Sequence, residues 1–512
     1  MINKIIKKAL VSVSDKSNLK ILADFLYRNQ IEVLSTGGTS KELKKLNPEI
    51  KITQISKYTG SKEILDGRVK TLHPKIHAGI LADRQNKQHM LELKKNTAMP
   101  IDLVVVNLYP FEKTSSNKKN SEKICIENID IGGPTMIRAA AKNFKNVIIL
   151  SDPDSYLPFI QEFEKKMSVS DATRKNLAIK AFEITSYYES LISNWFNRDN
   201  VDLCQKKSSI PLKKISKLRY GENPHQSGSF YSYGDHKLKQ INGKDLSFNN
   251  IYDLESAVSL ANEFTDNSCV IVKHGNPCGV ALNKVQHIAY EKALECDEVS
   301  AFGGVVAFNS KVTEKTAKMI SKIFTEVVIA PNFEVKAKDL LSQKKNLILI
   351  GYKRSKNSTK FNIKSTENFI LIQERNVKVV KQKDLEFKTK EIPNKKSIKD
   401  MLFAYTVSKY VNSNAIVLAS GLKTVGIGIG QTSRVDSTKL AINKANKKYK
   451  ESDTVLASDG FFPFPDIVKL CSKNNIKYII QPGGSINDKS VIKAADKLNI
   501  SIVFTKIRHF KH

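Results

Sequence analysis

The sequence predicts an α/β protein built from more than one domain. Short β-branched runs alternate with amphipathic helical stretches through most of the chain, which is the pattern of βαβ units around a parallel sheet. The chain has 512 residues, far more than one hydrophobic core usually serves. Apolar residues make up 41% of it and charged residues 26%, so it can bury real cores rather than stay disordered.

The first 150 residues carry the clearest alternation. The expected strands are 9–13, 32–34, 103–106 and 146–150, and the expected helices are 18–28 and 40–46. A long helical pattern over 171–198 closes this region. A polar, Lys-rich stretch follows at 201–217, and we expect it to link an N-terminal domain, 1–200, to a C-terminal region, 218–512.

The C-terminal region also alternates between strands and helices. Its strand-like runs are 269–272, 304–308, 326–330, 415–419, 454–457, 478–480 and 501–504. A weakly patterned segment rich in Lys, Asn and Ser, 336–399, separates two blocks, 218–335 and 400–512. We expect this segment to connect two subdomains, and the sequence leaves open whether they are structural duplicates.

The composition excludes several classes of protein. No apolar run approaches the roughly 18 residues that a membrane helix needs, so no membrane partner is expected. Lys4, Lys7 and Lys8 interrupt what would have to be the apolar part of a signal peptide, and we therefore expect a cytoplasmic protein. Six scattered cysteines without a CxxC pair indicate reduced thiols rather than a disulfide framework or a structural zinc site.

The formal net charge of +32 first suggests nucleic acid as a partner, because a basic surface releases counterions from phosphates. The lysines are spread along the whole chain, however, without a basic tail or an RNA- or DNA-binding module. We therefore expect a solvated, Lys-rich surface and no specific nucleic acid. The planar guanidinium group of arginine can bind phosphate or carboxylate through two parallel hydrogen bonds. Five of the 11 arginines lie in the motifs described below: Arg68, Arg138, Arg219, Arg434 and Arg508.

Two loops at the ends of neighbouring expected strands suit a phosphate. Residues 12–16 are Ser-Val-Ser-Asp-Lys, and residues 35–39 are Ser-Thr-Gly-Gly-Thr. A turn of this kind before a helix presents backbone N–H groups, hydroxyls and the positive end of the helix. Each loop alone is equally explained as a plain turn with a helix N-cap, but the pair together favours a phosphate site.

Cations and hydroxyls crowd the segment 66–79, Asp-Gly-Arg-Val-Lys-Thr-Leu-His-Pro-Lys-Ile-His-Ala-Gly. Arg, Lys and His this close together repel one another unless an anion joins them. His73 and His77 have the spacing of zinc ligands on a helix. Pro74 is expected to spoil that helix, and no third ligand is near, so no metal is expected.

Three further residues of the first half stand at expected turns. Tyr109 follows an apolar strand, at the edge where α/β sheets open to ligands. Asp130 lies beside two glycines, and a helix is expected to start near Arg138. Asp130 and Lys142 are twelve residues apart, so both reach one pocket only if the chain turns at those glycines.

The motifs of the C-terminal region also lie where expected strands end. The loop 218–226, Leu-Arg-Tyr-Gly-Glu-Asn-Pro-His-Gln, has the composition of a ligand loop. An apolar strand ends at Lys273 and His274, and the neighbouring cation would keep His274 neutral, as a general base requires. A His that is hydrogen-bonded within a turn is the alternative. The Gly-rich stretch 426–434 has neither Rossmann nor Walker spacing, and the charged end of the chain, 508–512, is expected to be disordered.

Together these segments resemble one family, the bifunctional purine biosynthesis proteins that are both aminoimidazole-carboxamide ribotide (AICAR) formyltransferase and IMP cyclohydrolase. The resemblance runs from residue 9 to residue 512 and fails mainly across 333–399. Its most specific stretches are DGRVKTLHPKIHAGIL, NIDIGGPTMIRAAAKN, LRYGENPHQ, VKHGNPCG, SNAIVLA and RHFKH. It implies a methylglyoxal-synthase-like parallel-sheet domain for the cyclohydrolase. For the transferase it implies two cytidine-deaminase-like α/β subdomains, usually completed across a homodimer interface, although the deaminase zinc signature is absent.

The resemblance also implies roles for single residues. In the transferase, His274 would be the base beside Lys273, Asn414 would orient the substrate, and 10-formyltetrahydrofolate would donate the formyl group without a metal. The residues expected to bind nucleotide or folate are Arg219, Tyr220, Arg434, Phe461, Arg508 and His512. In the cyclohydrolase, the residues expected around the formyl and carboxamide groups are Lys70, Tyr109, Asp130 and Lys142. Those expected to hold the 5′-phosphate are Lys16, Ser35, Thr39, Arg68 and Thr71.

The chain departs from the family pattern at two positions near Phe461. Gly460 and Pro465 stand where the family commonly has Ala and Arg, so the aromatic wall there differs. Two other functions compete with the bifunctional enzyme: a nucleic-acid-binding protein driven by the charge, and an enzyme that keeps only one activity. The motifs of both sites are present, which favours the bifunctional enzyme.

Overall fold

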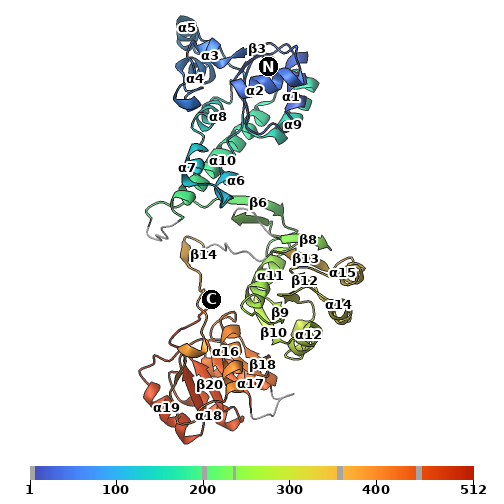
Figure 1. Cartoon of the computed structure of the whole chain (residues 1–512), viewed down its shortest axis with the longest axis vertical. Helices are drawn as coiled ribbons and strands as arrows, with labels where there is room; N and C mark the ends of the chain where they lie inside the picture. Colours follow the sequence, from blue (N-terminus) through green and yellow to red (C-terminus); the bar gives the residue numbers. More distant parts are fainter. Residues whose placement is uncertain (1–5, 199–204, 234–237, 354–360, 446–452) are drawn as a thin grey trace. The chain divides into compact units, whose positions relative to one another are not determined.

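The structure is a computed structural model that describes residues 6–198, 205–233, 238–353, 361–445 and 453–512 (Figure 1). Parts of the expected linker, 201–204, and of the expected connecting segment, 354–360, therefore lie outside the described residues. The chain divides into two compact units, Met1–Leu212 and Lys213–His512. Each unit has its own sheet and its own core.

Five parallel strands form the sheet of the N-terminal unit, in the order β3-β2-β1-β4-β5. They are β1 (Lys8–Ser12), β2 (Glu32–Ser35), β3 (Ile52–Gln54), β4 (Leu103–Val106) and β5 (Ile148–Leu150). The predicted parallel α/β sheet is therefore confirmed, and only β3, a short Ile-Thr-Gln strand, was not expected. Because the strand order reverses between β1 and β4, their carboxyl ends bound the crevice where open α/β sheets bind ligands.

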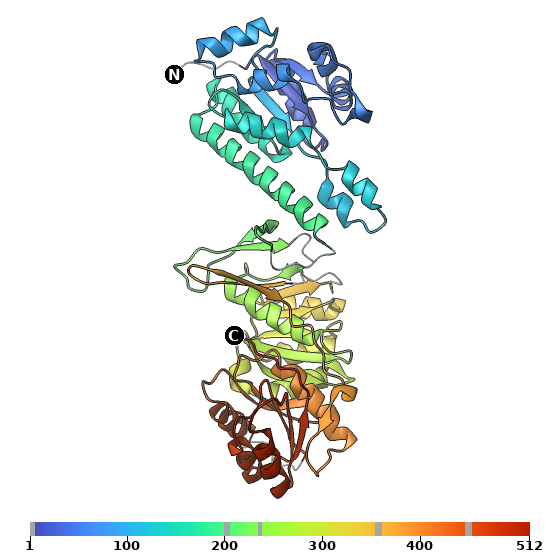
Figure 2. The same cartoon turned by 90° about the vertical axis from the view of Figure 1, so that its left-hand side faces the viewer.

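Helices cover this sheet so that β1, β4 and β5 are almost entirely buried, whereas two of the three residues of β3 are exposed. α1 packs against α9, and α8 packs against β4, β5 and α10, the long helix seen in Figure 2. The helices are α1 (Leu19–Arg28), α2 (Gly37–Leu46), α3 (Ile55–Thr59), α4 (Pro74–Leu81), α5 (Lys87–Lys95), α6 (Phe111–Ser116), α7 (Glu122–Glu127), α8 (Gly132–Lys142), α9 (Tyr156–Lys166) and α10 (Asp171–Phe196). All four residues of β4 are buried, as expected for a parallel strand covered on both faces.

Three helices of the N-terminal unit begin where the sequence predicted something else. α2 begins at Gly37 and α8 at Gly132, so glycines that we expected in turns lie in first helical turns instead. Pro74 opens α4 rather than spoiling it, because proline suits the first helical position, where no N–H is needed.

One mixed sheet of 12 strands organises the C-terminal unit, in the order β16-β21-β20-β19-β17-β18-β10-β9-β11-β12-β13-β8. The strands of its first half are β8 (Leu238–Asn242), β9 (Ser268–Lys273), β10 (Asn276–Leu282), β11 (Val305–Phe308), β12 (Val327–Ala330) and β13 (Ile348–Tyr352). Those of its second half are β16 (Glu386–Phe387), β17 (Ile416–Ser420), β18 (Lys423–Gly428), β19 (Val455–Ser458), β20 (Tyr478–Gln481) and β21 (Ser501–Phe504). Two small hairpins lie outside this sheet, β6 (Leu212–Lys217) with β7 (Ser229–Tyr233) and β14 (Phe361–Ser365) with β15 (Ile370–Glu374).

The strand order repeats itself on the two sides of the central pair, β10 and β18. On each side a hairpin is followed by an antiparallel strand, two strands parallel to that one, and an antiparallel edge strand. The two halves are therefore structural duplicates, a question that the sequence left open.

Helices cover both faces of the large sheet. α11 (Phe248–Ala261) and α16 (Lys395–Ser408) share one apolar core that extends through both halves. The opposite face has one core in each half, and its helices are α12 (Gln286–Leu294), α14 (Glu314–Ile320), α15 (Val335–Ser342), α17 (Arg434–Ala445), α18 (Asp466–Lys473) and α19 (Asp488–Lys497). Since both faces are covered, a ligand can reach the strands of this sheet only at their ends. Within the described ranges, no helix is long and apolar enough to cross a membrane.

Candidate active sites

The loops that follow β1 and β4 are joined by the side chain of Asn107. Its Oδ1 accepts hydrogen bonds from the N–H groups of Ser14 at 2.7 Å and Asp15 at 2.9 Å, and its Nδ2 donates to the Asp15 carbonyl at 2.8 Å. These bonds fix the loop that carries Lys16, whose side chain is exposed. Lys16 therefore lies in the loop after β1, which is one of the two loops at which a phosphate was expected.

Ser35 and Thr39 lie at the same edge of the sheet, but their hydroxyl protons are already used. Ser35 Oγ donates to the Val11 carbonyl at 2.8 Å, and Thr39 Oγ1 donates to the Val13 carbonyl at 3.2 Å. Both side chains are buried. They tie the β2–α2 loop to β1, which leaves the backbone N–H groups at the start of α2 as the donors that face outward.

The residues predicted in the segment 66–71 lie in three different surroundings. The guanidinium of Arg68 forms an exposed ion pair with Glu127, and the Lys70 ammonium pairs with Glu63 at 3.2 Å. Lys70 and Ser35 line one small pocket together with Thr36, Gly37, Gln54, Ile55, Ser56 and Glu63. The buried Thr71 lies against α8, because a Cβ atom at Gly132 would come within 2.6 Å of its Oγ1.

Asp130 caps the start of α8. Its Oδ1 accepts a hydrogen bond from the Gly133 N–H at 2.8 Å, and its own N–H donates to the Tyr188 hydroxyl at 2.8 Å. Burial raises the pKa of the Asp130 carboxyl, although hydrogen bonds from the N–H groups of Gly133 and Tyr109 act in the opposite direction. A carboxyl whose pKa is raised by burial is a candidate to accept and release a proton during a reaction.

The structure brings the backbone N–H of Tyr109 to Asp130 and places Thr71 against the first residue of α8, whereas the length of α8 separates Asp130 from Lys142. Because α8 starts at the glycines, Lys142 ends the helix about 15 Å away, at 1.5 Å per residue. The turn that would bring Asp130 and Lys142 together is therefore absent from the described residues, and the Lys142 side chain is exposed at the far end of the helix. The predicted residues of the N-terminal unit thus fall into two groups, Lys70 with Ser35 at the start of α2, and Thr71, Asp130 and the backbone of Tyr109 at the start of α8.

In the C-terminal unit, His274 and Gly275 form the tight turn between β9 and β10. His274 has a φ of +50°, a left-handed conformation that is unusual for a residue with a Cβ atom. The Asp253 carboxylate on α11 accepts hydrogen bonds from the Gly275 N–H at 2.6 Å and the His274 N–H at 3.3 Å. The Lys273 ammonium donates to the Phe302 carbonyl at 2.8 Å, so both predicted residues lie at one end of β9.

Asn414 lies at the start of β17 and faces Arg434 at the start of α17. Its Oδ1 accepts a hydrogen bond from Arg434 Nη2 at 2.7 Å, and its Nδ2 donates to the Gln431 carbonyl at 2.9 Å. Arg434 also pairs with the fully buried carboxylate of Asp459, which accepts a second hydrogen bond from the Ser413 hydroxyl. Asn414 and Arg434 were predicted as site residues, whereas Asp459 and Ser413, which hold them in place, were not.

The end of the chain is packed against this site, so the expectation of a disordered terminus was wrong. His509 is buried, and the Ser413 N–H donates to the Lys511 carbonyl at 2.8 Å. The Phe510 ring lies 4.3 Å from the Arg508 guanidinium carbon, 5.9 Å from that of Arg434 and 6.0 Å from the His512 ring. Apolar packing and backbone hydrogen bonds outweigh the positive charge of this segment.

Gly460 explains how closely Arg434 and Phe510 approach this part of the site. A Cβ atom at residue 460 would lie 2.5 Å from Arg434 Nη2 and 2.7 Å from Phe510 Cε1. The departure from the family's Ala therefore leaves room for both side chains. Phe461, the neighbouring residue, is 38% exposed and available to a ligand.

The loop 218–226 reaches the same site through α11. Arg219 stacks on Tyr220 at 4.8 Å and donates to its hydroxyl at 3.0 Å. Asn249 in the first turn of α11 donates to the Glu222 carbonyl at 3.1 Å, and Asp253 follows one helical turn later. One helix thus holds both the ligand loop and the His274 turn.

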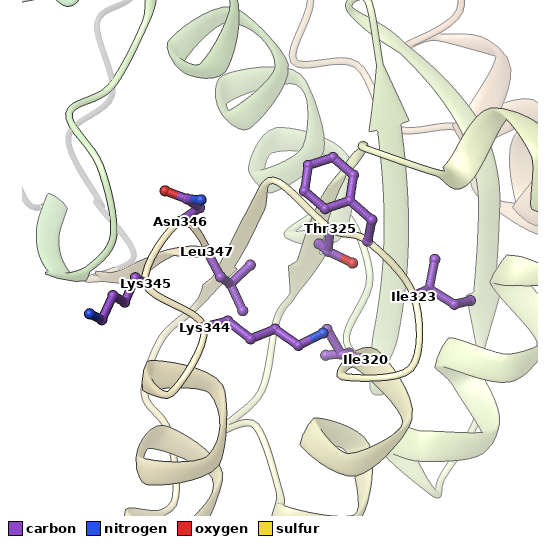
Figure 3. A pocket seen from close by; sticks show the side chains of 8 residues that line it. Ile320, Ile323, Thr325, Lys344, Lys345, Asn346 and Leu347 are labelled. Atoms are coloured by element: carbon purple, nitrogen blue, oxygen red, sulfur yellow. The ribbon is translucent and has the colours of Figure 1, made fainter.

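A pocket of about 220 Å³ lies at the amino ends of β12 and β13 (Figure 3). It is lined by Ile320, Ile323, Phe324, Thr325, Lys344, Lys345, Asn346 and Leu347. Phe324 packs on Phe302 with ring centroids 5.2 Å apart, and the carbonyl of Phe302 accepts the Lys273 ammonium. The pocket therefore borders the site without containing any predicted residue.

Comparisons with known proteins identify the family. The family model described as AICARFT/IMPCHase bienzyme matches residues 140–444, and the one described as MGS-like domain matches residues 18–135. The bifunctional purine biosynthesis proteins PurH of Fusobacterium nucleatum and of a Thermoanaerobacter species are each 47% identical to this chain, over 99% of it and 100% of their own length. A solved structure titled "Crystal structure of ForH" is 34% identical, covering 37% of this chain and 98% of that one with a TM-score of 0.32. The chain therefore belongs to the AICARFT/IMPCHase bienzyme family and is a bifunctional enzyme of purine biosynthesis, an AICAR formyltransferase and an IMP cyclohydrolase in one polypeptide.

Proposed function

We propose that the two activities occupy separate sites, the cyclohydrolase in residues 1–200 and the formyltransferase in residues 218–512, with 201–217 as the linker. The transferase is proposed to comprise subdomains at 218–335 and 400–512, joined by 336–399. The observation that supports separate sites is that Asp130 and His274, the two candidate proton carriers, belong to different compact units. Each lies at a strand or helix end, where an α/β fold presents ligand groups.

The cyclohydrolase site is proposed to close a ring on the formylated nucleotide. The carboxamide nitrogen attacks the formyl carbon, the new C–N bond forms as the nitrogen loses a proton, and the resulting carbinolamine loses water. Asp130 is the proposed proton carrier, because burial raises its pKa and the Tyr109 N–H donates a hydrogen bond to it. Lys70 would be released from Glu63 to face the substrate. The position of Lys142 at the far end of α8 supports a role outside the immediate reaction.

The 5′-phosphate is proposed to bind at Lys16 and the first turn of α2, with Thr71 and Arg68. The Arg68–Glu127 pair is exposed to solvent, and exposed pairs of this kind contribute little to stability, so a phosphate dianion can replace Glu127 at little cost. Ser35 and Thr39 would act by holding the loop in place, since their hydroxyl protons are used within the protein.

The transferase site is proposed to use 10-formyltetrahydrofolate as the formyl donor. The aromatic amine of AICAR attacks the formyl carbon, His274 takes the amine proton, and the folate nitrogen leaves with the bonding electron pair and a proton. Holding an electron-poor amine against the formyl carbon is the main task, so positioning groups matter as much as the base. Lys273, Asn414 and Arg434 are proposed for that role. Arg219, Tyr220, Phe461, Arg508 and His512 are proposed to bind nucleotide or folate, and no metal takes part in the proposal.

We further propose a cytoplasmic homodimer without a nucleic-acid or membrane partner. The support is the hairpin of β14 and β15, whose apolar side chains Phe369, Ile370, Leu371 and Ile372 are exposed in the single chain. Exposed apolar residues next to one another in sequence are typical of a surface that another chain covers. A second copy of this chain is the proposed occupant.

The experiment that tests the separate sites uses the full-length chain. The wild-type protein should convert AICAR and 10-formyltetrahydrofolate to IMP, and His274→Ala should abolish transfer while the pre-formylated nucleotide is still cyclised. Asp130→Asn should give the opposite result. Loss of both reactions in either folded variant would contradict the proposal.

A further inference from the structure

The side chain of Lys511 is largely buried within the C-terminal unit, as is that of His509, two residues earlier. Its ammonium donates hydrogen bonds to the carbonyls of Gly275 at 2.9 Å and Tyr410 at 3.0 Å, and it lies 3.4 Å from the Ser256 hydroxyl. Three oxygen atoms from three separate parts of the chain therefore surround one ammonium group. Such a set is what a protonated lysine needs in order to be buried.

The ammonium acts on the same turn that Asp253 holds from the other side. Asp253 accepts the N–H groups of His274 and Gly275, and Lys511 donates to the carbonyl of Gly275. The turn needs such support, because His274 has a left-handed backbone conformation that is unfavourable for a residue with a Cβ atom. The ring of Tyr252 closes the third side, since a Cβ atom at residue 275 would lie 2.3 Å from it.

The backbone of Lys511 is tied to the other half of the transferase site. Its carbonyl accepts the N–H of Ser413, the residue before Asn414, at 2.8 Å. The segment around Ser413 is also tied to β10, because the Asn412 N–H donates to Asn276 Oδ1 at 2.9 Å. One residue thus bonds to the His274 turn through its side chain and to the Asn414 segment through its main chain.

We propose that Lys511 is a positioning residue of the formyltransferase, which sets the distance between the His274 turn and the Asn414 segment, with Asp253 as its counterpart on the opposite side of the turn. The inference rests on the proposed roles of His274 and Asn414. In this proposal the end of the chain has two roles: Lys511 holds the base His274 in position, and Arg508 and His512 bind ligands.

The surroundings of Lys511 make the hydrogen bonds of its ammonium group sensitive to pH. Burial lowers the pKa of Lys511 to about 8, against the effect of the nearby Asp253 carboxylate. The other titratable groups on the elements packed around it are His274 in the turn, and Tyr410 with its partners Glu263 and Lys409. A neutral amine has two N–H donors for three acceptors. Loss of the proton therefore removes one of the hydrogen bonds that hold the His274 turn as the pH rises through about 8.

The test compares Lys511→Met, which removes the donors, with Lys511→Arg, which keeps a charge at all of the pH values used. Lys497→Met is the matched control, because Lys497 is exposed at the end of α19. Both kcat and KM for formyl transfer are measured from pH 6.5 to 9.5 with the full-length chain. Lys511→Met should lower kcat on the order of 100-fold with little change in either KM, as for a misplaced reacting group. The control should behave as the wild type.

The pH profile is a readout that a merely structural lysine does not move. Wild-type transfer should decline as the pH rises through about 8, and Lys511→Arg should keep its rate to higher pH while cyclisation follows one profile in all variants. If Lys511→Met does not fold, the comparison of the wild type with Lys511→Arg decides alone. Identical alkaline limbs in those two proteins, or unchanged kcat in a folded Lys511→Met, would overturn the inference. Persistent transfer by His274→Ala would instead overturn the proposed function.

Discussion

Arg434 Nη2 donates a hydrogen bond to Asn414 Oδ1 at 2.7 Å, while the same guanidinium pairs with the buried carboxylate of Asp459. Only a planar fork can make both contacts, because a lysine ammonium presents a single charged atom. Arg434→Lys should therefore lower formyl transfer on the order of 100-fold by releasing the Asn414 amide. Steady-state assays of both reactions on one preparation measure this.

The cyclohydrolase reaction serves as the control for Arg434→Lys. Arg434 belongs to the C-terminal unit, so cyclisation of the formylated nucleotide should proceed at the wild-type rate. Wild-type transfer by the lysine variant would show that the contact with Asn414 has no part in catalysis.

Asp130 should make the folding stability of the N-terminal unit depend on pH in a characteristic way. Burial raises its pKa, so between the unfolded and folded pKa values the folded state binds more protons than the unfolded state. Stability contributed by this group is then greatest at low pH and is lost as the pH rises through the folded pKa. The wild type should gain thermal stability relative to Asp130→Asn as the pH falls.

The same substitution removes the proposed proton carrier. Asp130→Asn should abolish cyclisation at all pH values, and wild-type cyclisation should decline as the pH falls through the raised pKa. Melting temperatures and cyclisation rates measured on the same pH series connect the two effects. Equal pH dependence of stability in both proteins would argue against a raised pKa at Asp130.

Two of the residues predicted to hold the 5′-phosphate, Ser35 and Lys16, should contribute in different ways, the first to stability and the second to binding. Ser35 donates within the protein from a fully buried position, so Ser35→Ala should lower the unfolding free energy by about 1 kcal/mol. Lys16 is exposed, and Lys16→Met should raise KM for the nucleotide about tenfold through the loss of one charge-assisted contact, without loss of stability. Denaturant titration and nucleotide KM values would reveal the reverse pattern if Ser35 were the ligand.

The sequence predicted the core strands well because they are continuous apolar runs, such as those at β4 and β9. It misplaced the starts of α2 and α8 because glycine was taken as a sign of a turn, whereas here the glycines of α8 let Asp130 and Thr71 approach the helix.

Residues that act by positioning another residue could not be predicted from the sequence. Asp253 lies on a helix with no motif of its own, and its role depends on a turn 21 residues away. Lys511 was visible only as part of a charged terminus, and its buried position results from contacts with the turn between β9 and β10, with α11 and with the segment after α16.

The hairpin of β14 and β15 should decide the oligomeric state. Replacing Phe369 and Leu371 together with Glu should convert a wild-type dimer to monomers, because charge on both would oppose burial. Lys364→Glu, on the same hairpin but polar to begin with, is the control. Sedimentation velocity measures the change, and a wild-type monomer at micromolar concentration would contradict the proposed dimer.

Gly133 offers the sharpest test of the Asp130 geometry, because α8 admits no side chain at that position. A Cβ atom there would lie 2.5 Å from Asp130 Oδ2 and 2.8 Å from Leu108 Cδ2. Without that clash, Gly133→Ala would favour the helix by up to about 1 kcal/mol. We expect instead that the carboxyl is displaced and cyclisation falls on the order of 100-fold, while formyl transfer is unchanged. Gly351→Ala is the control, since its Cβ would meet Ile241 at an ordinary 3.6 Å. A Gly133→Ala protein that is more stable and fully active would mean that Asp130 can move away from α8 and still serve the reaction.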